Sequence, residues 1–207
     1  MMHSSYNRRT ATKVKEGRVQ KKNRHISTCR LGLVLDRESP GKGYRHVLSK
    51  RDLQQFIDII PDWERLSQNL ERIVLSSPVA SEDAAYEFFH REETGAIYLH
   101  AWHDDLWTEL QTGYYEAHAD IFERLKVSRD NADSRIFCRF TEPQARAFML
   151  LHVFMHELGH HFDRMTQKHR NSTRGEDYAE RFAANRFQAM LPRYIRVFGD
   201  PSRPCRP

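Results

Sequence analysis

The amino-acid sequence predicts an α+β fold for this 207-residue chain. Two observations support this class: short runs rich in β-branched and aromatic residues come first, and two long helical patterns follow them. Because 39% of the residues are hydrophobic, the chain can bury one substantial core. Strands are expected at residues 72–75, 86–90, 96–100 and 136–140, and helices at 53–60, 145–165 and 176–191.

Turn-forming and capping residues define the ends of the shorter elements. The stretch from Ser49 to Asp52 can begin the first helix, and Pro61 is expected to end it. A turn at residues 93–95 separates the runs 86–90 and 96–100, which predicts a β-hairpin. The segment 104–126 is mixed and is expected to be helical in part.

A capping signal precedes the first long helix. Thr141 is suited to the N-cap position and Gln144 to the third helical position, which is the pattern of a capping box. Residues 145–155 are apolar nearly all round, so this helix is expected to be buried. It should continue through His160.

The motif His156-Glu157-Leu158-Gly159-His160 lies on this helix. Residues four apart in an α-helix differ by about 400° of rotation, so both imidazoles point from one face and can bind one metal ion. Glu157 can reach a water beside that ion without being a ligand itself. Gly159 suggests a close approach by another backbone or by substrate. The sequence therefore predicts a zinc site with its catalytic base.

A catalytic zinc site needs a third protein ligand, and the helix at 176–191 offers candidates. We expect Glu180 to be this ligand, with Pro192 ending the helix. Glu176, Asp177 and Asp163 are the alternatives, and Asp177 could instead orient a histidine. The other nearby candidates, His152, His161, His169 and Tyr178, are expected to be ordinary packed or solvated side chains.

This arrangement resembles the gluzincins, zinc peptidases that carry HExxH on one helix and a glutamate ligand on the next. The spacing is similar to that of thermolysin-like enzymes, in which an aspartate four residues after the ligand glutamate orients a histidine. With Glu180 as the ligand, that position is Ala184. The Glu-x-x-Ala pattern and Asn185 also resemble the second helix of ImmA/IrrE-like metallopeptidases.

The resemblance implies a zincin-like fold: a small mixed sheet packed on the HExxH helix, followed by a second helix carrying the third ligand. It also implies that His156, His160 and Glu180 hold Zn²⁺, and that Glu157 is the general base in peptide-bond hydrolysis. In zincins an extended peptide lies along an edge strand, and residues 95–100 are the expected strand here.

Charge is distributed unevenly along the chain. Residues 1–30 contain nine Lys or Arg residues and one acid, Glu16, a net charge of +8, so the remainder carries −3 of the total of +5. We expect a disordered basic arm at 1–30, a catalytic domain at 31–196 and a loose tail at 197–207. The arm is either a solubilising tail or a contact for nucleic acid or another acidic partner.

No apolar stretch of signal-peptide or membrane-spanning length is present, so no membrane contact is expected. The three cysteines are odd in number and lack metal-type pairing, which argues against a disulfide framework and favours the cytoplasm. A peptide or protein is the expected substrate. The alternatives are a regulatory or nucleic-acid-associated binding module and a zinc hydrolase of non-peptide amides.

Overall fold

A computed structural model describes residues 32–80, 82–132, 135–166 and 172–203, together with two short strands near the N-terminus. These strands, β1 (Val14–Lys15) and β2 (Arg18–Val19), pair antiparallel. The rest of the expected basic arm at 1–30 and the end of the expected tail, residues 204–207, lie outside the described residues. Within the tail, Ser202 and Arg203 donate hydrogen bonds to the Asp200 carboxylate and form a turn.

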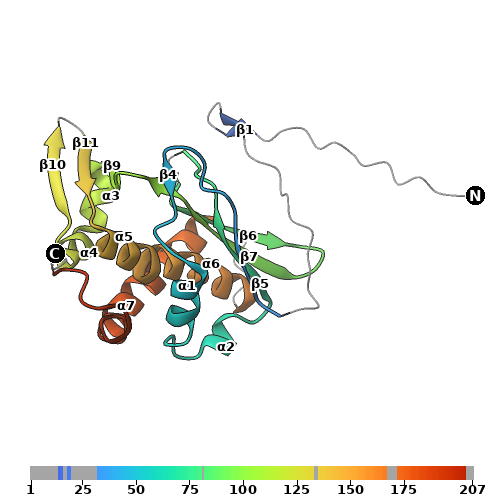
Figure 1. Cartoon of the computed structure of the whole chain (residues 1–207). Helices are drawn as coiled ribbons and strands as arrows, with labels where there is room; N and C mark the ends of the chain where they lie inside the picture. The colour runs from blue at the N-terminus through green and yellow to red at the C-terminus, as the bar shows by residue number, and fades with distance from the viewer. Residues whose placement is uncertain are drawn as a thin grey trace, which may run out of the picture.

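The chain is an α+β protein, as the sequence predicts. Its main sheet has the strand order β3-β5-β7-β6, in which β3 and β5 are parallel, β5 and β7 are parallel, and β6 is antiparallel to β7 (Figure 1). The members of this sheet are β3 (Val34–Arg37), β5 (Leu70–Ser76), β6 (Ala84–Phe89) and β7 (Thr94–His100). The predicted strand at 72–75 and the predicted hairpin are confirmed.

The expectation that residues 95–100 form an edge strand is wrong. β7 pairs with β5 on one side and with β6 on the other, so both of its edges carry ladder hydrogen bonds. Among the described strands of this sheet, β3 and β6 form the edges. The hairpin pattern predicted the partner β6 but gave no information on β5, which is distant in sequence.

Two smaller sheets lie beside the main one. The first has the order β10-β11-β9, and the second pairs β4 with β8. The predicted strand at 136–140 is confirmed as β11. The members are β4 (Tyr44–Arg45), β8 (Trp102–His103), β9 (Trp107–Gln111), β10 (Ser128–Ala132) and β11 (Arg135–Arg139).

Short helices pack against the sheets and the longer helices. In α1, Ser49 accepts the Asp52 N–H and the Asp52 carboxylate accepts the Ser49 N–H, a capping box that explains where the helix begins. The predicted partly helical segment contains α3 and α4, which are joined at His118. The short helices are α1 (Lys50–Ile57), α2 (Trp63–Leu66), α3 (Thr112–Ala117) and α4 (Ala119–Leu125).

The buried helix that carries the motif begins at the predicted cap. Thr141 accepts the Gln144 N–H, and the Gln144 side chain accepts the Thr141 N–H at 2.7 Å. The helix consists of α5 (Glu142–Phe148), a π-helical segment (Met149–Val153) and α6 (Phe154–Thr166). The π-helical turn, which the sequence did not predict, lies directly before the motif, and such turns often occur at functional sites.

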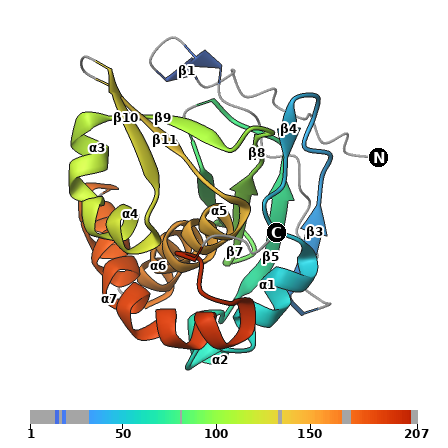
Figure 2. The same cartoon turned by 60° about the vertical axis from the view of Figure 1, so that its left-hand side comes forward.

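The last helix, α7 (Ser172–Phe198), packs against α6 and continues past the predicted end. Pro192 does not end it, which corrects the expectation. Met190 and Tyr194, on either side of Pro192, are each only 1% exposed, so burial of these side chains offsets the backbone hydrogen bond that proline removes. Figure 2 shows α7 curving around α5 and α6 on the side away from the sheet.

Gly159 lies where α6 and α7 pack closely together. A Cβ atom at this position would lie 2.9 Å from the Ala179 Cα and 3.2 Å from the Phe182 side chain. Only glycine fits without a shift of the backbone, as expected from the sequence. This close contact allows α7 to approach the helix that carries the motif.

Candidate metal centre

The two motif histidines face each other from successive turns of α6. The Nε2 atoms of His156 and His160 are 3.0 Å apart, and both side chains are largely buried. Two ring nitrogens at this distance either share a proton in a hydrogen bond or can both bind one metal ion through their lone pairs. The pair therefore has the arrangement of metal ligands that one helix face is expected to produce.

Glu176 completes this group from the first turns of α7. Its Oε1 lies 3.1 Å from His156 Nε2, and its Oε2 lies 3.4 Å from His160 Nε2. In a tetrahedral zinc site with bonds of roughly 2.0–2.2 Å, neighbouring ligand atoms are about 3.3 Å apart. The three residues could therefore hold one metal ion, and the exposed Glu176 side chain leaves the site open to solvent.

Glu180, the expected third ligand, lies on the other side of the His156 ring. Its Oε2 is 3.0 Å from His156 Nδ1, and its Oε1 is 2.7 Å from His118 Nε2. A carboxylate accepts hydrogen bonds, so His156 Nδ1 donates here, and in the neutral ring its Nε2 keeps the lone pair that a metal requires. The position of Glu180 is that of a residue orienting His156, while Glu176 lies with the Nε2 atoms.

The two remaining candidates differ in their surroundings. Asp163 is buried, and its electrostatic interaction with His160 places a negative charge near that ring. Asp177 is exposed on α7 and belongs to neither metal-binding group among the described residues.

Glu157 projects from α6 toward the edge strand β6. It is buried, and it accepts a hydrogen bond from the backbone N–H of Tyr86. Burial raises the pKa of Glu157 to about 7, although the neighbouring His156 opposes this shift. A carboxyl group with a pKa near neutrality is suited to proton transfer in both directions.

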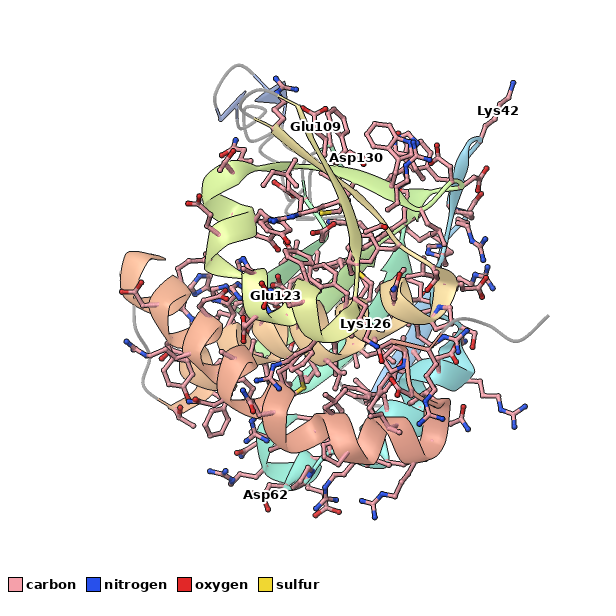
Figure 3. All side chains as sticks on the ribbon, turned by 90° about the vertical axis from the view of Figure 1, so that its left-hand side faces the viewer. Lys42, Asp62, Glu109, Glu123, Lys126 and Asp130 are labelled. Atoms are coloured by element: carbon pink, nitrogen blue, oxygen red, sulfur yellow. The ribbon has the colours of Figure 1, made fainter. Side chains whose placement is uncertain are left out.

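His118 is a site residue that the sequence did not predict. It comes from the junction of α3 and α4, which lies beside α7. In Figure 3 the label Glu123 marks α4, and the label Lys126 marks the end of that helix. Its Nδ1 lies 2.7 Å from the Tyr114 carbonyl oxygen. Although desolvation opposes it, the hydrogen bonds to Glu180 and Tyr114 raise the pKa of His118. A single histidine outside any motif gave no signal of this role.

The other histidines near the motif, and Tyr178, are expected from the sequence to be ordinary packed or solvated side chains. His161 is fully buried, and its Nε2 donates to the Gln68 carbonyl while its Nδ1 accepts from the Tyr86 hydroxyl, so it is a satisfied core residue. His152 is also buried, but its Nδ1 has no hydrogen-bond partner. Tyr178 packs against Phe182. His169 lies outside the described residues.

Compared with known proteins, the chain matches no family model, no curated protein and no solved structure. Across the part of the chain that the structure describes, no helix combines the length and the apolar character needed to cross a membrane.

Proposed function

We propose that this protein is a zinc-dependent metallopeptidase of the gluzincin type with a zincin-like fold. The observation that carries the proposal is the convergence of His156, His160 and Glu176 at distances that fit one zinc ion, with Glu157 beside them. Three protein ligands and an open side are typical of catalytic rather than structural zinc sites.

Assigning Glu176 as the third ligand also accounts for Glu180. In thermolysin-like enzymes an acidic residue four positions after the ligand orients a histidine, and Glu180 is four positions after Glu176. Its carboxylate hydrogen-bonds His156 Nδ1 at 3.0 Å. With Glu180 as the ligand, that position would be Ala184, which has no such group. The assignment of Glu176 therefore supplies the orienting acid of the thermolysin-like pattern, while it shortens the spacing from His160 to the ligand from 20 to 16 residues.

The side chains of the site divide the chemistry between them. Zn²⁺, when bound, would polarise the substrate carbonyl and lower the pKa of the attacking water. Glu157 would take a proton from this water and deliver it to the leaving amine, which is consistent with its raised pKa. Glu180 would hold His156 in the tautomer whose Nε2 is free to bind the metal.

The edge strand β6 is the best candidate for binding an extended peptide. It forms one edge of the main sheet, packs against α6, and includes Tyr86, whose backbone N–H contacts Glu157. A peptide pairing with this strand would lie beside the proposed general base. Main-chain hydrogen bonds would then supply affinity with little demand on the peptide sequence.

Glu157→Gln tests the proposal. This variant should keep the fold and the bound zinc, because Glu157 is not a ligand, but it should lose roughly 10²–10⁴-fold in peptide cleavage because the general base is absent. Zinc content and digestion of a broad peptide library are measured on the variant, on wild type and on Glu116→Gln, which changes an exposed glutamate of α3.

Cleavage by Glu157→Gln at the wild-type rate would contradict the mechanism. Zinc binding by wild type without cleavage of any peptide would favour the two alternative functions, a binding module or a hydrolase of non-peptide amides. Salt-dependent nucleic-acid binding would then support the first of these.

A further inference from the structure

A second group of histidine and glutamate side chains lies one helical turn from the proposed zinc site. It consists of His118, His152 and Glu180, each of which offers one nitrogen or oxygen atom within 4.8 Å of the others. His152 is four residues before His156, and Glu180 is four residues after Glu176. The second group therefore repeats the two-histidine, one-glutamate composition of the first along the α6–α7 pair.

The contact between His118 and Glu180 requires either a proton or a metal ion between the two side chains. Its Nδ1 lies 2.7 Å from the Tyr114 carbonyl oxygen, which only accepts, so Nδ1 carries the hydrogen. In the neutral ring Nε2 then has a lone pair, and it faces Glu180 Oε1 at 2.7 Å. Two acceptors at this distance require a proton or a metal ion between them.

His152 distinguishes these two possibilities, because a shared proton would give it no role. Its side chain is 3% exposed and its Nδ1 has no hydrogen-bond partner. An unpaired buried polar group destabilises the folded state, and an apolar side chain of similar size would avoid this cost. The ring packs against that of His118, with centroids 4.6 Å apart, so it borders the same site.

We infer that His118, His152 and Glu180 form a second metal site that binds Zn²⁺ or a similar divalent transition-metal ion. Two imidazoles and one carboxylate suit such ions, whereas Ca²⁺ and Mg²⁺ prefer oxygen ligands alone. The two histidines are buried, while the Glu180 side chain is 40% exposed and provides access from solvent. Widening the 2.7 Å contact to the roughly 3.3 Å spacing of zinc ligands requires only a small movement of this exposed side chain.

The second site does not depend on peptide cleavage, but it is linked to the first through one carboxylate. Glu180 would bind the second ion through Oε1 while Oε2 still accepts from His156 Nδ1. The two ions would therefore lie on opposite sides of the His156 ring rather than share a bridging water.

Counting bound zinc on the full chain tests this inference. Metal-free protein is dialysed against micromolar free Zn²⁺ and the bound metal is measured for wild type, His152→Leu, Glu176→Gln and the control His90→Gln, which changes an exposed histidine. Wild type and the control should bind two ions per chain. His152→Leu and Glu176→Gln should each bind one. Thermal unfolding of the metal-free variants checks that each is folded.

The outcomes separate the second site from the proposed catalytic one. A single ion in wild type, retained by His152→Leu and lost by Glu176→Gln, would overturn the second site and leave the first intact. A single ion in wild type that is lost by His152→Leu and retained by Glu176→Gln would contradict the proposed catalytic site. If His152→Leu is unfolded, His118→Gln replaces it, and two ions bound to His118→Gln would overturn the inference.

Discussion

Replacing Glu176 and Glu180 in turn is the sharpest test of how the site is built. The two residues are one turn apart on α7, and the structure gives them different neighbours: His156 and His160 Nε2 for Glu176, and His156 Nδ1 with His118 Nε2 for Glu180. Glu176→Gln removes a charged donor from the proposed zinc. Glu180→Gln alters only the group that orients one of its ligands.

The expected magnitudes follow from these positions. Four-ligand structural zinc sites have apparent binding free energies of about 10–16 kcal/mol, so one ligand accounts for about 2.5–4 kcal/mol, or roughly 10²–10³-fold in affinity. Loss of a group that hydrogen-bonds a ligand histidine typically costs about 10–100-fold. Glutamine at position 180 keeps one oxygen acceptor for His156, so the lower end, about tenfold, is expected.

Zinc dissociation constants are measured by competition with a chromophoric chelator. All variants carry His152→Leu, so that only the ion of the first site is titrated. The exposed Asp177→Asn, on the same turn of α7, is the control and should change nothing. An affinity loss for Glu180→Gln equal to or greater than that for Glu176→Gln would refute the assignment and return the ligand role to Glu180.

Two further predictions concern stability. Gly159→Ala should lower the free energy of unfolding by about 1–3 kcal/mol, because its Cβ would lie 2.9 Å from the Ala179 Cα. Urea denaturation measures this change. The control Gly113→Ala should not destabilise the protein, because the space around its Cβ position is open. Burial lowers the pKa of His161 to about 4 from an unfolded value of 6.5, so the unfolded state binds the proton first as pH falls. Stability contributed by neutral His161 is thus complete above pH 6.5 and lost toward pH 4, by about 3 kcal/mol. Between pH 6.5 and pH 4 the free energy of unfolding should therefore fall by about 3 kcal/mol less in His161→Gln than in wild type. An equal fall in both proteins would contradict the reasoning.

Local signals were sufficient for much of the secondary structure. The capping boxes at Ser49 and Thr141 mark where their helices begin, because they satisfy backbone N–H groups within a few residues of the same segment. The hairpin of β6 and β7 could be predicted for the same reason, since its partners are neighbours in sequence. The helical period likewise placed His156 and His160 on one face.

Features that depend on packing between distant segments could not be obtained in this way. Whether β7 is an edge or an inner strand depends on its parallel pairing with β5, which no local pattern describes. Pro192 signals a helix end, but burial of Met190 and Tyr194 outweighs the lost hydrogen bond. Local propensity is a weak term compared with burial of large side chains.

The sequence by itself determined the motif, its helix and the presence of acidic residues on the helix that follows. Only the tertiary structure decided which acid lies where, because Glu176 and Glu180 share one face of α7 and the choice depends on how α7 is positioned along α6. The contact of Gly159 with Ala179 allows α7 to approach α6 closely, and Glu176 lies at the Nε2 atoms. His118 joins Glu180 only because α3 and α4 fold beside α7, a contact between segments far apart in the chain.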